Sequence, residues 1–401
     1  MSVTKNLNVP FHGAAGPLLD GAAAAQMILD QIGTAVDQIT LDSTIQSNNV
    51  EPTLWHSDPE GMKGTLNFYK PAGFGGYFVN YAKTTALEGS EKITYTLQRY
   101  EVATATLVFW GGMWLVVKGV QTDVDPLAGN PYTIEGFWIH NPWEPSGSAT
   151  GEYITYNPTW LTTYFTPISV QSSTTGQASQ WSGQFVSICD PELPKLGPQA
   201  LHPPKLAARG EQLIERSDVV RLAQDHVKAH DLVQEESFRR ALEQAQPGEP
   251  ELVHRLDIPH SFDYLVPFLR GQAVTAVLRV DGRFGYLQQA LSYADGVRFP
   301  RITWDEVRQR LAQEVLEVTE WIAQEGCLGQ CFPDKYQVFK GMFCLYPALV
   351  WVPCWESRSP FYPFYMVSIG SDRFYISSLD GAVYRRLHPF GPTGPQRPGG
   401  L

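Results

Sequence analysis

The chain has 401 residues, of which 43% are hydrophobic and 12% aromatic, and its formal net charge is −11. A chain of this length usually folds as two or three domains, and so high an apolar content excludes global disorder. The acidic balance argues against nonspecific binding to nucleic acid or to an anionic membrane surface, because both require clustered Lys and Arg.

The N-terminal sequence from Met1 to Pro10 lacks the apolar core of a signal peptide. No apolar run in the chain is long enough to span a bilayer. We therefore expect a cytoplasmic protein. The five cysteines are an odd count and do not form a disulfide framework. Cys327 and Cys331 lack the further paired ligands of a zinc site, so we predict reduced thiols, no metal and no cofactor.

The first predicted element is a helix that begins near Asp20. From Gly21 to Asp30 the sequence is apolar on nearly every face, and its run of alanines lets other backbone approach closely. This pattern predicts a buried helix. The sequence that follows, up to about residue 195, is rich in aromatic residues, Thr, Gly and Pro. Its short apolar or alternating runs predict strands at residues 94–97, 104–110, 115–120, 132–139 and 184–188.

A helix followed by a strand-rich stretch predicts an α+β domain over residues 1–195, with a buried central helix against an antiparallel sheet. Several prolines then mark a linker, which we place at residues 196–210. The charged sequence from 211 to 246 carries an apolar stripe at helical spacing.

The remaining sequence contains a weak internal repeat. Each unit has a helical stretch followed by short strands, and each ends in an Asp-Gly turn, at Asp281 and at Asp380, which is a strong hairpin signal. We predict two small helix-plus-antiparallel-sheet modules and a Gly/Pro-rich disordered tail, at residues 211–300, 301–390 and 391–401. Both modules resemble PepSY-like modules, small units often found beside peptidases.

Four stretches of the first 190 residues carry a second resemblance. They are residues 9–12 with 20–27, residues 55–61, residues 111–119 and residues 136–143. In order and spacing they resemble the bacterial papain-like cysteine peptidases related to the double-glycine leader peptidases. The resemblance implies a papain-like fold in which Asp20 starts the nucleophile helix. It also implies that Met113 stands at the position of the catalytic histidine and Asn141 at that of the orienting residue.

The resemblance further implies a degenerate member without the family's chemistry. Such a peptidase needs a thiolate at a helix N-terminus, a histidine that holds the proton, and a residue that orients this histidine. Asp20 replaces the cysteine, Met113 replaces the histidine, and the upstream glutamine position falls at Gly13 or Ala14. Because only Asn141 keeps a usable side chain, we do not expect cysteine peptidase activity.

Two interpretations of Asp20 stay open. Asp is among the best helix N-caps, so Asp20 can simply cap the helix. Alternatively, it acts as acid, base or nucleophile on a small substrate, together with Asn141 and a histidine. His12, His56 and His140 lie in the matching stretches, and His140 is the catalytic candidate beside Asn141.

Apolar side chains near the same positions either belong to the core or wall a ligand pocket. The candidate ligand-binding residues are Met113, Trp110, Trp114, Trp138, Trp143, Trp55 and His56. His226 and His230 have a metal-compatible spacing but no evident third ligand, so we predict a solvent-facing helix surface there.

Three functions remain from the sequence. The favoured one is a pseudopeptidase that binds a peptide, a protein partner or a small molecule in the former catalytic cleft without cleaving it. The second is a repurposed enzyme of a biosynthetic pathway that uses Asp20 on a non-peptide substrate. The third is a structural or regulatory protein that acts through its C-terminal repeats, where the aromatic segment 361–365 offers a contact surface. The sequence does not determine the oligomeric state.

Overall fold

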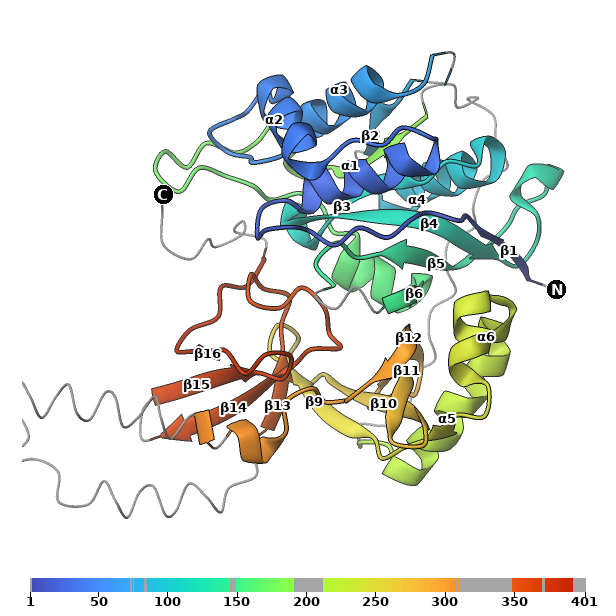
Figure 1. Cartoon of the computed structure of the whole chain (residues 1–401), viewed down its shortest axis with the longest axis vertical. Helices are drawn as coiled ribbons and strands as arrows, with labels where there is room; N and C mark the ends of the chain where they lie inside the picture. The colour runs from blue at the N-terminus through green and yellow to red at the C-terminus, as the bar shows by residue number, and fades with distance from the viewer. Residues whose placement is uncertain are drawn as a thin grey trace, which may run out of the picture.

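Helices and a large, mostly antiparallel sheet make up this protein, described here from a computed structural model (Figure 1). The structure describes residues 2–72, 74, 76–82, 85–144, 149–190, 212–307, 309–310, 348–369 and 372–391. This confirms the predicted mixture of helices and antiparallel strands. The predicted linker at 196–210, most of the tail and the pair Cys327 and Cys331 lie outside the described residues.

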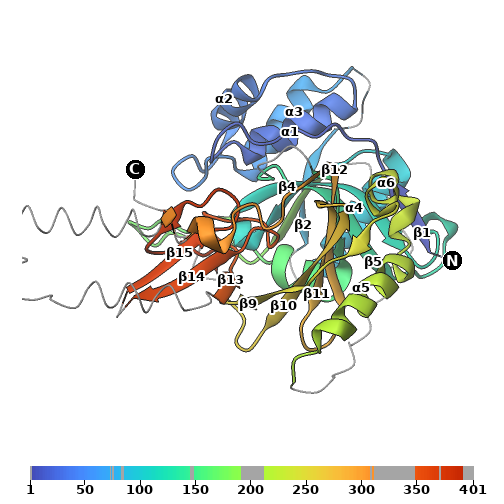
Figure 2. The same ribbon diagram turned by 60° about the horizontal axis from the view of Figure 1, so that its bottom comes forward.

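The elements of the first 190 residues surround one large core. In chain order they are β1 (Val3–Asn6), α1 (Asp20–Gln31), α2 (Gln38–Asn48), α3 (Pro59–Tyr69), β2 (Phe78–Ala82), α4 (Ala86–Tyr95), the π-helix η1 (Thr96–Tyr100), β3 (Thr104–Val108), the 3₁₀ turn η2 (Phe109–Gly111), β4 (Met113–Thr122), η3 (Pro126–Ala128), β5 (Ile134–His140), β6 (Ala149–Thr155), the π-helix η4 (Tyr156–Tyr164) and β7 (Phe185–Cys189). In both views α1, α2 and α3 lie together on one side of the strands (Figures 1 and 2).

After residue 212 the described part of the chain forms helices, a short 3₁₀ turn and further strands of the same sheet. They are α5 (Arg216–Ala229), η5 (Leu232–Gln234), α6 (Glu236–Leu242), β8 (Gln246–Pro247), β9 (Glu251–Arg255), β10 (Phe262–Arg270), β11 (Ala273–Asp281), β12 (Leu287–Val297), β13 (Ala348–Trp351), β14 (Phe364–Ile369), β15 (Asp372–Ser377) and β16 (Val383–Tyr384).

The sheet runs without a break from one half of the chain to the other. Within the described residues its order is β16-β15-β14-β13-β9-β10-β11-β12-β6-β5-β4-β3-β7-β2, with β1 beside β4 and β8 beside β10. The antiparallel pairing of β12 with β6 joins the two halves, and β13 runs parallel to β9.

The predicted buried helix is confirmed as α1. Its four consecutive alanines have no exposed surface, and Met27, Ile28 and Leu29 are equally buried. The small side chains allow α1 to lie directly against β4 and α2. The removal of this apolar surface from water is the main source of stability for the layer.

Several predicted elements also agree with the structure. The runs at 104–110, 115–120, 132–139 and 184–188 coincide with β3, β4, β5 and β7, and the charged stretch after 211 forms α5 and α6. Both Asp-Gly hairpins are present, as β11–β12 and β15–β16. Asp281 accepts hydrogen bonds from the N–H groups of Arg283 and Phe284, which explains why this turn needs an aspartate.

The predicted strand at 94–97 is wrong, because these residues belong to α4 and η1. Ile93 and Leu97 are both fully buried and four residues apart, so the run packs with helical spacing despite its β-branched residues. Helices α2 and α3 were not predicted either. Their start signals are Asp37, which accepts from the N–H of Thr40, and Asp58, which accepts from the N–H of Gly61.

Among the described residues, no helix combines the length and the apolar character that crossing a membrane requires.

Candidate functional site

The side chain of Asp20 lies at the first turn of α1, where the resemblance places a nucleophile. Its Oδ2 accepts a hydrogen bond of 2.7 Å from the backbone N–H of Trp114. Trp114 follows Met113 at the start of β4, so the structure does bring together the positions assigned to the nucleophile and to the histidine. Asp20 is only 9% exposed. Its hydrogen bond with Trp114 connects the start of α1 to the sheet.

The capping interpretation of Asp20 is wrong. The N-cap residue of α1 is Leu19, and no described side chain caps this helix. Asp20 is instead the first helical residue, and its carboxylate points toward β4 and toward Arg358.

Arg358 connects Asp20 to the third predicted position. Its Nη1 lies 3.7 Å from Oδ1 of Asp20, and its Nη2 donates a hydrogen bond of 3.0 Å to the carbonyl oxygen of Pro17. The side-chain amide of Asn141 donates to the carbonyl oxygen of Arg358, over 3.3 Å. Asp20 and Asn141 are therefore linked through a residue from the C-terminal half of the chain.

Burial governs the electrostatics of this pair. It raises the pKa of Asp20 and lowers the pKa of Arg358, because water no longer stabilises either charge. Each charge opposes the shift of the other, and the N–H of Trp114 further favours the carboxylate. One oxygen of Asp20 accepts from the N–H of Trp114 and the other lies at ion-pair distance from Arg358, so both contacts stabilise the carboxylate and weaken it as a nucleophile.

Two aromatic side chains accompany Arg358 in covering this site. The guanidinium carbon of Arg358 lies 4.6 Å from the ring centroid of Trp355 and 5.8 Å from that of Phe390. We call Trp355, Arg358 and Phe390 the C-terminal plug. Phe390 stacks on Phe109 with centroids 6.0 Å apart and an interplanar angle of 6°.

Gly112 allows the plug to approach the strand that begins at Met113. A Cβ atom at Gly112 would lie 2.4 Å from the ring of Phe390, closer than any side chain can tolerate. The preceding turn is itself unusual, since Phe109 and Trp110 have φ values of 52° and 57° in the left-handed region. This turn directs Phe109 at Phe390, and the strain is offset by the aromatic packing that it permits.

The other candidate pocket residues are mostly core. Met113 is 1% exposed, and the indole N–H of Trp114 donates to the carbonyl oxygen of Ser57. The indole N–H of Trp55 contacts Glu51 and Ser179. These side chains are buried in the core around α1.

Of the remaining tryptophans, Trp110 and Trp143 pack against the same core and Trp138 does not. Trp138 packs against Phe238 of α6 and Tyr153, with centroids 5.6 and 4.9 Å away, in a different core from that of α1. Trp110 and Trp143 are half-buried, and the ring of Trp143 lies 6.4 Å from Tyr362. The structure therefore gathers five members of the predicted ligand-binding set around the core of α1 and places Trp138 in another core; the five are Met113, Trp55, Trp110, Trp114 and Trp143.

The histidines are engaged elsewhere. His140 is buried, and its Nε2 lies 2.9 Å from the carbonyl oxygen of Val9, to which it donates. Burial, with the nearby charge of Lys118, lowers its pKa to about 3, so it stays neutral near pH 7. His56 pairs with Asp42 and His12 with Asp30, each over 2.9 Å.

His226 and His230 are half-buried, so the predicted solvent-facing surface is wrong. His226 contacts the carbonyl oxygen of Gly285 over 2.7 Å, and Nδ1 of His230 lies 3.5 Å from the hydroxyl of Tyr153. Across the ranges that the structure describes, no group of three or more His, Cys, Asp or Glu side chains is arranged to hold a metal ion.

Sequence reasoning missed Arg358. It lies in an irregular aromatic-rich segment after β13 that has no helical or strand period. Its partners Asp20, Pro17 and Asn141 all belong to the other half of the chain, and no local signal connects them.

Comparisons with known proteins give no relative for this arrangement. A scan against protein-family models, a search of curated proteins and a search of solved structures each found no match.

Proposed function

We propose that this protein is a non-catalytic binding protein, a pseudopeptidase with a papain-like N-terminal half whose former catalytic position is occupied by its own C-terminal plug. The observation that carries the proposal is the chain of contacts from Asp20 to Arg358 to Asn141. In this proposal Asp20, paired with the guanidinium of Arg358, takes the position of the thiolate, and Met113 takes that of the imidazole.

The layout of the first half supports the papain-like part of the proposal. A buried helix packs on an antiparallel sheet, its first residue contacts the start of one strand, and Asn141 directly follows the neighbouring strand β5. Residues 13 and 14 lie against the loop after Asn141, since the N–H of Ala14 donates to the carbonyl oxygen of Pro142 over 2.7 Å. This is the side from which an oxyanion-stabilising residue would act, and Gly13 and Ala14 carry no amide side chain.

The burial of Asp20 argues against the repurposed-enzyme alternative. A general base or nucleophile must come within about 3 Å of a substrate atom. Asp20 is held between Trp114 and Arg358, and His140 donates to a backbone carbonyl and not to Asp20.

A peptide or protein partner of the former cleft would have to displace Arg358, and a small molecule would need another cavity. We propose that the C-terminal strands, which follow helices α5 and α6 and which we propose to be PepSY-like, bind such a ligand instead.

The proposal is tested by incubating the full chain with a mixed peptide library and analysing the products by mass spectrometry. We expect no cleavage by the wild type. Cleavage that persists through purification, disappears in Asp20→Asn and survives in Asp30→Asn would overturn the proposal. Asp30 is the matched control because it lies on the same helix and pairs with His12 away from Arg358.

A further inference from the structure

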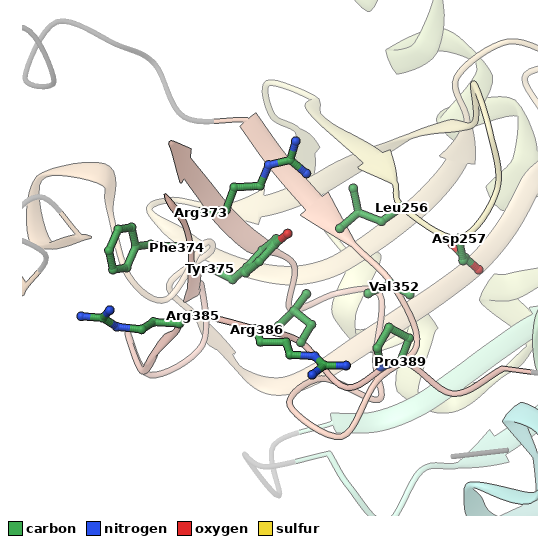
Figure 3. A pocket seen from close by; sticks show the side chains of 10 residues that line it. Leu256, Asp257, Val352, Arg373, Phe374, Tyr375, Arg385, Arg386 and Pro389 are labelled. Carbon is green, nitrogen blue, oxygen red and sulfur yellow. The ribbon is translucent and has the colours of Figure 1, made fainter. Parts of the chain in front are cut away.

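A cavity of about 530 Å³ lies in the C-terminal half, away from Asp20. Its walls come from the β9–β10 connection, the end of β13, strand β15 and the segment after β16. Figure 3 shows Arg373 and Arg386 on either side of Tyr375, with Leu256 and Val352 across from them. Ligand pockets in proteins usually enclose about 300–1,000 Å³, so this volume suits a small molecule.

The charge of the lining is strongly one-sided. Two guanidinium groups face the cavity, those of Arg373 and Arg386, against the single carboxylate of Asp257. This carboxylate is already neutralised, because Arg255 donates to both of its oxygens over 2.8 and 2.6 Å. The cavity therefore has a positive potential in a chain whose formal net charge is −11.

The arginines are placed at the rim. Arg373 and Arg386 are exposed. In Figure 3 the Arg385 side chain points away from the cavity, and its guanidinium carbon lies 5.5 Å from the ring centroid of Phe374, so Arg385 is not part of the proposed site.

The floor of the cavity is apolar. Val352 and Leu387 are 3% and 7% exposed and belong to one cluster of buried side chains, against which Tyr375 packs. An apolar floor under a cationic rim selects a ligand that has both an apolar body and an anionic group.

We propose that this cavity is a binding site for a small organic anion, in which a phosphate or carboxylate group is attached to an apolar or aromatic body. Arg373 and Arg386 bind the anionic group, and Leu256, Val352 and Leu387 contact the body. Guanidinium groups suit both oxyanions because their paired N–H donors match two oxygens. The proposal goes beyond the pseudopeptidase function and stands independently of it.

Titration calorimetry on the full chain tests this proposal with phenyl phosphate as the probe. Inorganic phosphate and phenol separate the anionic part from the apolar part, and phthalate tests a carboxylate in place of the phosphate. We expect saturable binding of phenyl phosphate or phthalate, and weaker binding of inorganic phosphate and phenol. Whichever of the two binds more tightly identifies the anionic group.

Charge-removing variants locate the site. We expect Arg373→Gln and Arg386→Gln each to raise the Kd by about tenfold, which corresponds to one lost charge-assisted contact. Arg221→Gln is the matched control, since it removes the same charge from an exposed arginine on α5, and its Kd should equal that of the wild type. The proposal is overturned if neither organic anion binds, or if all three variants change the Kd equally. Binding of an acidic peptide alone would also overturn it, because a flat protein-docking surface would then explain the charge.

Discussion

Asp20 and Arg358 form a buried ion pair between the first turn of the central helix and a loop near the end of the chain. Their closest N–O distance is 3.7 Å, and their side chains are 12% and 2% exposed. Neither residue belongs to the β12–β6 strand pair that joins the two halves of the chain. The ion pair is therefore a further contact between the halves, separate from the sheet.

The ion pair should be important for stability. Asp20→Asn keeps an oxygen that accepts from the N–H of Trp114 but leaves Arg358 without its counter-charge. Breaking a buried pair in this way costs about 3–5 kcal/mol, and urea denaturation measures the loss. Asp30→Asn should change the free energy of unfolding by less than about 1 kcal/mol, because its pair with His12 is half-exposed.

A double variant separates the pair from its surroundings. In Asp20→Asn with Arg358→Met, no charge is left buried, so much of the lost stability should return. If Asp20→Asn alone leaves the free energy of unfolding unchanged, the ion pair does not hold the plug in place.

The close approach of Gly112 to Phe390 gives the second prediction. Gly112→Ala places a methyl group 2.4 Å from the ring, so Phe390 must move away from Phe109. We expect a loss of about 1–3 kcal/mol in the free energy of unfolding, typical of overpacking. Gly13→Ala is the control, since its Cβ meets no atom closer than 3.8 Å.

The same prediction includes a rescue. In a Phe390→Ala background the ring is absent, and Gly112→Ala should then have almost no further effect on stability. Equal destabilisation in both backgrounds would show that Gly112 is required for its own backbone conformation and not for the plug.

The predictable parts of the fold are those with a local pattern. The alanine helix and strands such as β4 follow from the sequence because each is an almost continuous apolar run, which predicts an element buried on all sides. Helix α2 carries polar Thr, Ser, Asn and Gln on most faces, so its aspartate cap is its main signal. Helix α3 has further signals that the sequence analysis did not use, namely Pro59 in its first turn and the apolar spacing of Met62 and Leu66. The strand period also explains Trp138: neighbouring residues of a strand face opposite sides, and Phe137 occupies the core around α1.

The site depends on contacts between residues far apart in the chain, which no helical or strand pattern in the sequence indicates. The order of the segments predicts that Asp20, Met113 and Asn141 lie near one another. This order does not indicate Arg358, which contacts both Asp20 and Asn141. Its position follows from how the C-terminal strands continue the sheet through β12 and β6, which is a property of the complete fold.

Glu152 should make stability fall as the pH rises. Burial and the neighbouring carboxylate of Glu144 raise its pKa to about 8 from a usual value of 4.5. Between these two pH values the folded protein keeps a proton on Glu152 that the unfolded chain releases. The free energy of unfolding therefore falls as the pH rises from about 4.5 to about 8.

The variant Glu152→Gln tests whether Glu152 makes stability fall as the pH rises. The amide copies the protonated acid, and its oxygen still accepts from Gln289. As the pH rises from about 5 to about 8, the free energy of unfolding of the variant should increase by a few kcal/mol relative to that of the wild type. Urea denaturation across that range measures the difference. Glu249→Gln, at a side chain 76% exposed, should follow the wild-type curve; parallel curves for Glu152→Gln would contradict a buried neutral acid.

His140 should act in the opposite direction, with stability lost as the pH falls. Its folded pKa is lowered to about 3 from 6.5, so the unfolded chain takes up a proton below about pH 6.5 that the folded protein does not. His230, whose pKa burial lowers to about 4, adds a loss of the same sign.

His140→Gln removes the contribution of His140 while leaving an amide that can donate to the carbonyl oxygen of Val9. The slope of unfolding free energy against pH between about pH 6.5 and pH 4 should therefore become shallower, with a residual slope from His230 and from His226, whose pKa burial also lowers. His260→Asn is the control, because this histidine is exposed and its φ of 57° is one that Asn tolerates. An unchanged slope in His140→Gln would contradict the prediction, because it would mean that burial beside Val9 and Phe11 does not lower the pKa of His140.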